Sequence, residues 1–398
     1  MKYDIAIIGA GIVGLATAFQ ISERRPDLTI QIIDKEDGVA RHQTGHNSGV
    51  IHSGIYYQPG GSKALNCRKG YGYLLDFARQ HGIPHDLCGK VIVATRKAEL
   101  KQLEEIYQRG SANGLEGIRM LEPEELYEKE PHVQAIRAIW VPQAGIINYK
   151  AVAAKYLELV QQRNGYALFG ARVLDISVTR QGVIVHTDQA EVHCKLLINC
   201  AGLYSDKIAR MTMPELDIQI LPFRGEYYEL TPEKRHLANN LVYPVPNPNF
   251  PFLGVHFTRM IDGGVEAGPN AVLAFKREGY SRWDINLAEL TETLSFPGFR
   301  KIAQRYWRDG LDEFYRSYSK AAFVKALQHL IPEIGINDLQ RGNSGVRAMA
   351  CDTAGNLIDD FLFLERERVI NVCNAPSPAA TASLAIGETV AEKAIGRL

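Results

Sequence analysis

The chain has 398 residues, which is enough for two domains with sizeable cores. Its 45 basic residues balance 45 acidic ones, so the net charge is zero and we expect no nucleic-acid partner. The most apolar window, residues 5–19, is interrupted by glycines, is shorter than the roughly 20 residues of a membrane span, and has no basic leader. We therefore expect a cytoplasmic protein, either free or on the cytoplasmic face of the inner membrane.

The strongest local signal lies near the N-terminus. An apolar run at residues 5–8 predicts a buried parallel strand, and Gly9, Gly11 and Gly14 form G-x-G-x-x-G at the start of a predicted helix. Gly9 permits a tight turn, Gly11 lets the backbone approach a pyrophosphate, and Gly14 lets the helix lie close to the strand. A second predicted strand ends at Asp34, whose carboxylate can bind ribose hydroxyls. Together these features indicate a dinucleotide site.

The six cysteines do not form a metal-binding pattern. No two are spaced as C-x-x-C, and the closest pair, Cys194 and Cys200, brackets an apolar strand. We therefore expect reduced, mostly buried thiols and no metal ion.

After Asp34 the chain alternates between loops, helices and strands. Residues 41–60 are rich in His, Tyr and Gly, a composition typical of a loop that holds a ligand. The predicted elements are a helix at 63–82, a strand at 89–95, a charged helical segment at 98–131, a helix at 148–164 capped by Asn148, and strands at 172–179, 183–187, 190–193 and 195–200. The turn at Ala201-Gly202 should lie at the carboxyl edge of the parallel sheet, where such folds bind ligands.

The character of the sequence changes at residue 217. Pro- and aromatic-rich segments at 221–230, 241–246, 252–258 and 263–275 predict a mainly antiparallel second domain, and helices follow at 299–330. The chain then returns with a closing helix, whose start signal is Ser377 as N-cap and Pro378 as first residue. We expect an α/β fold with an α+β second domain, in which 1–85, 145–216 and 340–398 form the first domain and 86–144 and 217–339 the second.

Several segments resemble one family of flavoenzymes. They are GAGIVG, HQTGHNSGVIHSGIYY, NCAGLYSD, PFRGEYYEL, YPVPNPNFPFLGVHFTRMIDG, GPNAVLAFKREGY and NAPSPAATASLAIG. Together they are similar to the FAD-dependent superfamily of D-amino-acid oxidase and glycerol-3-phosphate dehydrogenase, over nearly the whole chain. The resemblance implies a Rossmann-like FAD-binding domain with a mostly antiparallel substrate domain. In some relatives a cysteine near the position of Cys351 carries the flavin, but here we expect non-covalent FAD.

The resemblance also implies which residues hold FAD. Gly9, Gly11 and Gly14 would bind the pyrophosphate, Asp34 the ribose and Val173 the adenine. The residues expected to line or approach the flavin are Gln43, Thr44, Asn47, Ser48, Val50, Ala201, Gly202, Pro378, Ala379, Ala380 and Thr381. The last four would direct N–H groups at the flavin edge that becomes negatively charged on reduction.

Within the superfamily, the resemblance implies oxidation of L-2-hydroxyglutarate to 2-oxoglutarate, with the Cα hydride passing to flavin N5. Arg347 is expected to bind the carboxylate beside Cα as a bidentate fork; the alternative is a structural salt bridge. His52 or His256 would accept the hydroxyl proton, and the loop position favours His52, with His256 as a substrate ligand. The candidates for the distal carboxylate are Tyr57, Arg224, Tyr243, Thr258 and Arg259.

The resemblance implies a membrane quinone as electron acceptor, with oxygen as a slower alternative. The segment 299–330 mixes Arg and Lys with aromatic residues, among them Trp307, Phe314 and Phe323. This composition suits a helix lying on an anionic membrane surface, and it equally suits an amphipathic helix packed on its own domain.

Three other functions fit parts of the sequence. They are another superfamily enzyme acting on an amino acid or glycerol-3-phosphate, a non-catalytic binding protein with a nucleotide fold, and a nicotinamide dehydrogenase. A nicotinamide enzyme does not need a terminal segment that returns to the cofactor, so the C-terminal block favours a flavoenzyme.

Overall fold

The strand β1 (Lys2–Ile8) lies at the centre of the first sheet in the computed structural model, which describes residues 2–246 and 254–398. Its side chains are buried on both sides, because Ile5 and Ile7 pack against helices while Ala6 and Ile8 pack against the opposite layer. β1 pairs in parallel with β2 (Ile30–Ile33) and β12 (Glu191–Asn199), which confirms the predicted parallel strands.

The other strands extend this sheet on both sides. β9 (Gly165–Leu168) and β20 (Val369–Asn374) add in parallel, and β10 (Val173–Thr179), β11 (Gly182–Thr187) and β19 (Leu362–Arg366) add antiparallel. The prediction of two strands at 190–193 and 195–200 was wrong, because β12 runs through both. Cys194 is buried and Lys195 exposed, so the alternation of a strand continues where no turn residue interrupts it.

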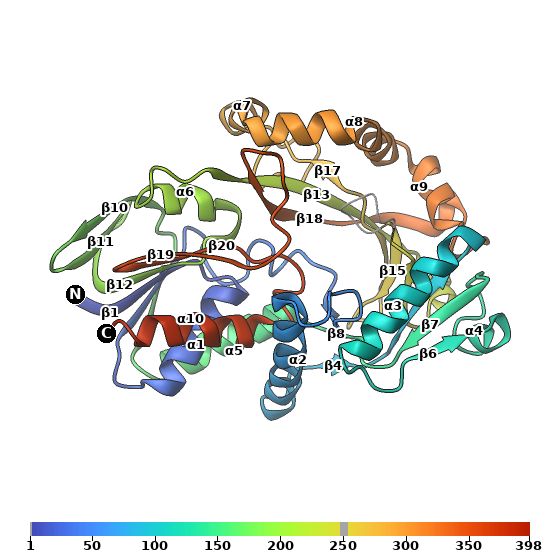
Figure 1. Ribbon diagram of the computed structural model, residues 1–398, viewed down its shortest axis with the longest axis horizontal. Helices are drawn as coiled ribbons and strands as arrows, with labels where there is room; N and C mark the ends of the chain where they lie inside the picture. Colours follow the sequence, from blue (N-terminus) through green and yellow to red (C-terminus); the bar gives the residue numbers. More distant parts are fainter. Residues whose placement is uncertain (1, 247–253) are drawn as a thin grey trace.

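Helices cover the first sheet on both faces (Figure 1). On one face lie α1 (Ile12–Arg24), α2 (Ser62–Gln80), α5 (Tyr149–Gln161) and α10 (Ser383–Ile395), with the short α6 (Ser205–Arg210) on the other. The predicted cap of α5 is confirmed, since the Asn148 side chain accepts hydrogen bonds from the N–H groups of Lys150 and Ala151.

The predicted start of the closing helix was wrong. α10 begins at Ser383, and the residues before it form turns in which Ser377 caps no helix. The Thr381 hydroxyl is held by Tyr149 and by the amide of His52, so tertiary hydrogen bonds override the local Ser-Pro signal.

A second, larger sheet is antiparallel except for one pair. Its described strands follow the order β17 (Val272–Leu273), β13 (Ile218–Leu230), β16 (Val265–Gly268), β15 (His256–Arg259), β14 (Leu241–Pro244), β5 (Lys90–Ala94), β7 (Arg137–Val141) and β6 (Arg119–Leu121), and β18 (Leu339–Asp352) also pairs with β13. The parallel pair is β14 with β5. The predicted strand at 252–258 begins outside the described residues and is described from His256 onward.

Helices pack around this second sheet (Figure 1). They are α3 (Leu100–Ala112), α4 (Pro123–Lys129), α7 (Leu287–Ser295), α8 (Pro297–Tyr318) and α9 (Lys320–Leu327). The segment 98–131 is not helical throughout, because β6 separates α3 from α4. A small third sheet joins β3 (Val50–Ile51) and β4 (His85–Asp86) to β8 (Gly145–Ile147). The division into domains stays a prediction; β18 places residues 340–352 in the second sheet.

Candidate active site

The three positions after β1 are occupied by glycine for different structural reasons. Gly9 has φ +108°, and a Cβ there would lie 2.4 Å from the carbonyl oxygen of Cys200. A Cβ on Gly14 would lie 2.1 Å from the carbonyl oxygen of Gly9. At Gly11 the nearest atom would be Thr44 Oγ1 at 3.5 Å, an ordinary contact, and φ is −79°. Packing therefore requires glycine at the first and third positions, whereas the second leaves open space for a ligand.

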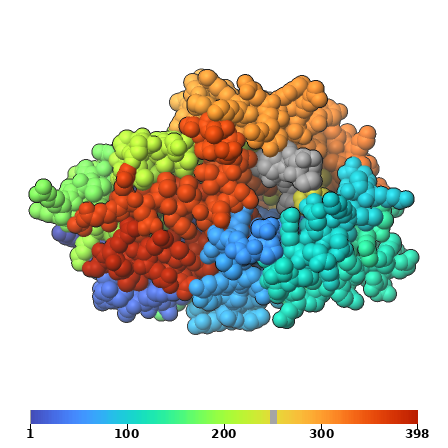
Figure 2. Space-filling model, in the orientation of Figure 1, coloured from blue at the N-terminus to red at the C-terminus, as the bar shows by residue number. Residues whose placement is uncertain are grey.

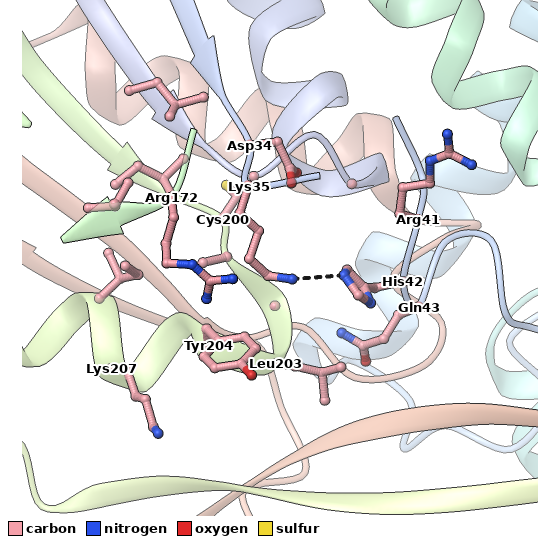
Figure 3. A pocket seen from close by; sticks show the side chains of 18 of the residues that line it. Asp34, Lys35, Arg41, His42, Gln43, Arg172, Cys200, Leu203, Tyr204 and Lys207 are labelled. Carbon is pink, nitrogen blue, oxygen red and sulfur yellow. Dashed lines mark hydrogen bonds between the residues drawn. The ribbon is translucent and has the colours of Figure 1, made fainter. Parts of the chain in front are cut away.

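That open space belongs to a cavity of about 310 Å³ at the carboxyl ends of β1, β2 and β12 (Figure 3). It lies at the edge where parallel sheets bind nucleotides, beside the N-terminus of α1. The predicted residues that line it are Gly9, Gly11, Asp34, Gln43, Thr44, Val173, Ala201 and Gly202. The structure thus brings together half of the residues predicted for the dinucleotide, from separate parts of the chain.

Asp34 and Thr44 also organise the cavity wall. The Asp34 carboxylate accepts hydrogen bonds from the N–H groups of Ala10 (2.6 Å) and Glu36 (2.9 Å), which holds the glycine loop against β2. Burial raises the pKa of Asp34 despite these amides. Thr44 Oγ1 accepts from the N–H of Ile12 at 2.9 Å, so one free amide at the start of α1 already has a partner within the protein.

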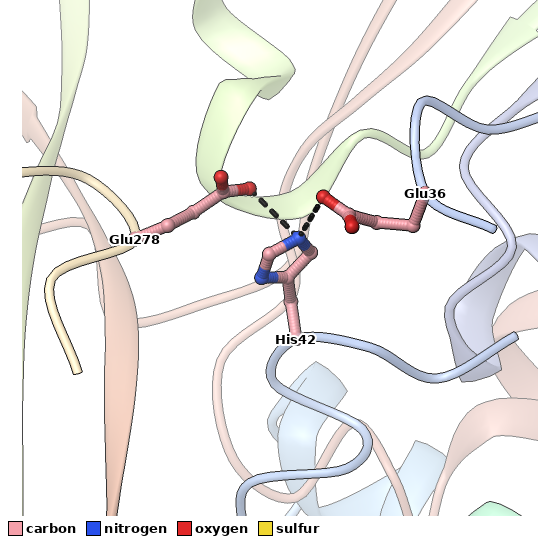
Figure 4. A group of neighbouring side chains, drawn as sticks. All are labelled: Glu36, His42 and Glu278. Atoms are coloured by element: carbon pink, nitrogen blue, oxygen red, sulfur yellow. Dashed lines mark hydrogen bonds and ion pairs between the residues drawn. The ribbon is translucent and has the colours of Figure 1, made fainter. Parts of the chain in front are cut away.

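A charged cluster that the sequence did not reveal lies at the rim of this cavity (Figure 4). His42 Nε2 lies 2.9 Å from carboxylate oxygens of both Glu36 and Glu278, and Lys35 Nζ lies 2.7 Å from Glu278. Lys35 is the main reason that the pKa of Glu36 falls to about 2. Because Lys35 also pairs with Glu36, its ammonium supplies the positive charge that this carboxylate pair needs.

Hydrogen bonds join the loop 41–60 to the C-terminal turn. Tyr149 Oη donates to the carbonyl oxygen of Val50 and lies 2.8 Å from Thr381 Oγ1, which accepts from the N–H of His52. Among the described residues, none accepts a hydrogen bond from the N–H groups of Ala380 and Thr381. These amides are therefore available to a ligand, although they belong to a turn that precedes α10.

Other predicted cofactor residues shape the loop itself. The Asn47 side chain donates to the carbonyl oxygens of Gln43 and Thr44 and accepts from the N–H of Gly49. Gln43 Oε1 accepts from the N–H of Ala348, which ties the loop to β18. The remaining predicted residues of this group lie in the same loop or in the C-terminal turn: Ser48, Val50, Pro378 and Ala379.

A second polar cluster lies on one face of the larger sheet. His256 stacks on Tyr243 with ring centroids 3.9 Å apart, and the two share a face because Val242 lies opposite Phe257. His256 Nδ1 lies 2.9 Å from the carbonyl oxygen of Gly254, which can only accept. Nδ1 therefore carries the proton, and Nε2 has a free lone pair that can accept another.

Two cations flank the His256–Tyr243 stack. Burial, then Arg347 and Lys90, lower the pKa of His256 to about 3, while burial, Lys90 and His256 lower that of His52 to about 3. Both rings are neutral at pH 7 and can act as proton acceptors. The guanidinium of Arg347 forms no hydrogen bond or ion pair with any residue in the described part of the chain, although its backbone pairs with β13.

The candidates for the distal carboxylate have different surroundings. Arg224 is buried and paired with Glu226 at 3.0 Å, and Arg259 pairs with Asp86 at 3.2 Å, so both cations already have partners. Because neighbouring side chains alternate, Arg224 and Arg347 leave the β13–β18 ladder on opposite sides. Tyr57, by contrast, faces Lys63, whose Nζ lies 5.7 Å from its ring.

Sequence reasoning missed two buried ionisable groups on the same face as Tyr243. Lys90 heads β5 and is fully buried, and Glu266 lies opposite Thr258 on β16. Burial, then Glu229 and Asp262, raise the pKa of Glu266 to about 7. The sequence offered one signal that could have identified them. Lys90 in GKVIVA and Glu266 in GGVEAG are each an ionisable residue within a short apolar strand, where such residues are rarely buried.

The fold and the cavity define a class of protein. A parallel sheet with a glycine loop, an acid after β2 and a second antiparallel sheet are features of flavin-dependent oxidoreductases, and the family model "FAD dependent oxidoreductase" matches residues 4–393. The chain belongs to this family and is an enzyme that uses FAD.

Particular relatives are more specific. The chain is 54% identical to L-2-hydroxyglutarate dehydrogenase of Indibacter alkaliphilus over 100% of both chains. It is 44% identical to L-2-hydroxyglutarate dehydrogenase of Escherichia coli (strain K12), covering 98% of this chain and 93% of the relative. It is also 42% identical to the mitochondrial L-2-hydroxyglutarate dehydrogenase of Homo sapiens, covering 98% and 88%.

Solved structures share the fold. The FAD-bound, dithionite-reduced L-alpha-glycerophosphate oxidase of Mycoplasma pneumoniae has a TM-score of 0.80 at 24% identity, covering 100% of this chain and 95% of that one. Glycine oxidase of Geobacillus kaustophilus has a TM-score of 0.74 at 16% identity, covering 100% and 95%. These likenesses confirm the predicted fold class.

Proposed function

We propose that this enzyme oxidises L-2-hydroxyglutarate to 2-oxoglutarate. The observation that carries the proposal is the similarity, over the full chain, to several proteins named L-2-hydroxyglutarate dehydrogenase, one of them 54% identical. FAD, when bound, would supply the two-electron acceptor for the hydride that leaves Cα. The residues of this chain must then bind the carboxylate, orient Cα and remove the hydroxyl proton.

Arg347 is the residue we assign to the carboxylate beside Cα. Its guanidinium is unpaired among the described residues and acts on His256 and Tyr243, so it lies beside a proton acceptor. His256 is the better placed base, because its tautomer leaves Nε2 free, whereas His52 Nε2 lies 3.3 Å from Ser377 Oγ. An anionic substrate beside His256 will raise its pKa from about 3 toward the working range.

For the cofactor we propose the predicted arrangement. Gly11 and the start of α1 would bind the pyrophosphate, Asp34 the ribose, Val173 the adenine, and Ala380 and Thr381 the flavin edge. The open space at Gly11 and the free amides of the C-terminal turn support it. We expect FAD to be non-covalent, because the thiol of Cys351 is fully buried beneath Gly298 and Ile302 of α8.

An anaerobic spectral titration tests the reaction. Addition of L-2-hydroxyglutarate to the yellow protein is expected to bleach the flavin band, with the D-enantiomer as control. Bleaching by neither enantiomer would remove this substrate while leaving FAD in place. Bleaching by an amino acid or by glycerol-3-phosphate would then assign the enzyme to another activity of the same superfamily.

For the electron acceptor we propose a membrane quinone, with oxygen as the slower alternative. Among the described residues, none lies in a helix long and apolar enough to cross the bilayer. On α8 the exposed residues Trp307, Leu311, Tyr315 and Tyr318 follow helical spacing and form one stripe, 55 to 66% exposed. Figure 2 shows the region around residue 300 (orange) at the surface of the molecule. Such a stripe suits the interface of a bilayer.

Phe323 does not belong to that surface. It is 1% exposed and packs in the core against Tyr228, so for Phe323 the second of the two interpretations holds, a residue packed on its own domain. Phe323 lies on the face of α9 that packs against the second sheet. The amphipathic pattern of the sequence could not show which aromatic residues lie on that face and which are exposed.

We expect the variant Trp307→Ser, Leu311→Ser, Tyr315→Ser to bind vesicles containing anionic phospholipid roughly 10-fold or more weakly than the wild type, because each apolar side chain contributes about 1 kcal/mol or more on insertion. Liposome flotation measures this. Tyr127→Ser is the control, since Tyr127 is also 66% exposed but lies on α4. Equal flotation of the wild type and the triple variant would remove the stripe from the proposal.

A further inference from the structure

Lys90 is the most unusual ionisable group in the second sheet. It is fully buried, and its Nζ has no hydrogen-bond partner among the described residues. Lys90 lies opposite Leu241 and Tyr243 lies opposite Ile92, so Lys90 and Tyr243 share a face of the β5–β14 pair. Nζ lies 4.4 Å from the centroid of the Tyr243 ring and 5.2 Å from that of Tyr56. The rings hold the cation, but they do not neutralise it.

No carboxylate within the described residues pairs with Lys90. A buried ammonium without a counter-ion destabilises the folded protein. We therefore expect an anion to bind beside such a group. Its surroundings contain another unsatisfied polar atom, since Tyr56 Oη is also buried without a partner among the described residues. The one buried carboxyl group placed above on this face is Glu266, whose pKa burial raises to about 7, and no ion pair joins it to Lys90. The ammonium of Lys90 is therefore a positive charge that still lacks an anionic partner.

Arg347 is the second cation of this face. Both Lys90 and Arg347 act on His256, one from β5 and the other from β18. Two unpaired cations lie on either side of one proton acceptor, His256. This arrangement matches a substrate in which each cation binds one of two carboxylates while the hydroxyl group faces His256.

We propose that Lys90 binds the distal carboxylate of the substrate and thereby makes the site selective for 2-hydroxy diacids over 2-hydroxy monoacids. This assignment rests on the proposed oxidation of a 2-hydroxy acid, and it replaces the weaker candidates Arg224 and Arg259, which already have acidic partners. The four-carbon stem of Lys90 lets the ammonium move out from between the rings of Tyr56 and Tyr243 when an anion arrives.

The test compares two substrates in the FAD-loaded enzyme. L-2-hydroxypentanoate has the carbon chain of L-2-hydroxyglutarate without the distal carboxylate. Lys90→Met is expected to lower kcat/KM for the diacid by roughly 30-fold or more, and that for the monoacid by less than about threefold. Lys90→Arg should recover part of the loss, since it keeps the charge. An equal loss for both substrates would mean a structural role and would overturn the proposal.

A binding experiment separates this proposal from the proposed reaction. Glutarate, a diacid that cannot be oxidised in this way, is titrated into wild-type and Lys90→Met holoenzyme and followed by the change in flavin absorbance. Weaker glutarate binding in the variant supports Lys90 even if the wild type oxidises no L-2-hydroxyglutarate. Equal binding of glutarate by both proteins overturns it even if the oxidation is confirmed.

The pH dependence of the wild type keeps the proposal testable if Lys90→Met does not fold. Burial lowers the pKa of Lys90 to about 8. Among the groups around it, His52 and His256 have pKa values of about 3, Cys88 about 11 and Cys67 about 12, and burial raises the pKa values of Tyr56 and Tyr243. Glu266, on the same face, has a pKa of about 7, so the test uses the range above pH 8. The ratio of kcat/KM for diacid to monoacid should fall above about pH 8. A constant ratio from pH 8 to 10 would overturn the proposal.

Discussion

Replacement of Arg347 by methionine is expected to lower kcat/KM for L-2-hydroxyglutarate by about 10³-fold, because the variant loses both the charge and the bidentate geometry that orient Cα. FAD content and melting temperature should stay close to those of the wild type. Arg347 is only partly buried and pairs with no described residue, so its loss strands no buried partner. Steady-state kinetics and flavin absorbance measure both quantities.

Arg341→Met is the matched control for Arg347. Arg341 lies on the same strand, is exposed, and should tolerate methionine without loss of activity. Arg347→Lys should be intermediate, because it keeps the charge but not the fork. A loss of less than about fivefold in Arg347→Met would contradict the assignment, and a lower melting temperature together with lost FAD would indicate a structural role instead.

Alanine substitutions at two glycines of the same loop are expected to have different effects, one on FAD binding and the other on stability. Gly11→Ala is expected to weaken FAD binding by roughly 10- to 100-fold with little change in the stability of the apoprotein, because the new Cβ meets no backbone atom of the protein but fills the ligand space. Gly14→Ala is expected to lower the free energy of unfolding by about 3 kcal/mol or more, since its Cβ would lie 2.1 Å from a backbone oxygen.

Fluorescence titration of apoprotein with FAD and denaturant unfolding of the apoprotein measure these two quantities separately. The unfolding must be done without FAD, because bound cofactor adds stability in proportion to its affinity. Unchanged FAD affinity in Gly11→Ala would contradict the placement of the pyrophosphate. An apoprotein of Gly11→Ala that unfolds as readily as that of Gly14→Ala would show that packing, not the ligand, requires the second glycine.

Much of the first sheet followed from local patterns. The apolar run before Gly9, the glycine spacing and the acid at Asp34 together predicted β1, α1 and β2, because each element is determined by residues next to one another. Asn148 was predicted as a cap for the same reason. Predictions failed where distant contacts compete with a local signal, as at Ser377, where hydrogen bonds to the Thr381 hydroxyl shape the turn.

The candidate substrate site could be predicted only in part. Arg347 and His256 were named from the sequence, but the position of Lys90 beside Tyr243 depends on the pairing of β5 with β14, whose residues lie about 150 positions apart. Likewise, the ion pair between Lys35 and Glu278 joins a loop of the first sheet to a loop of the second. Side chains that meet in this way leave no periodic or spaced pattern in the chain.

The nucleotide-binding edge could be predicted from residues close together in the chain, because glycine turns, buried strands and caps are properties of short segments, and the family could be predicted from the resemblance of several such segments. Which charges have partners became visible in the folded chain alone. Arg224 and Arg259 are neutralised by nearby acids, whereas Arg347 and Lys90 have no carboxylate partner among the described residues. A cation is available to a substrate when no acidic side chain lies beside it. Which acidic side chains lie beside it depends on contacts between strands and loops that are far apart in the sequence.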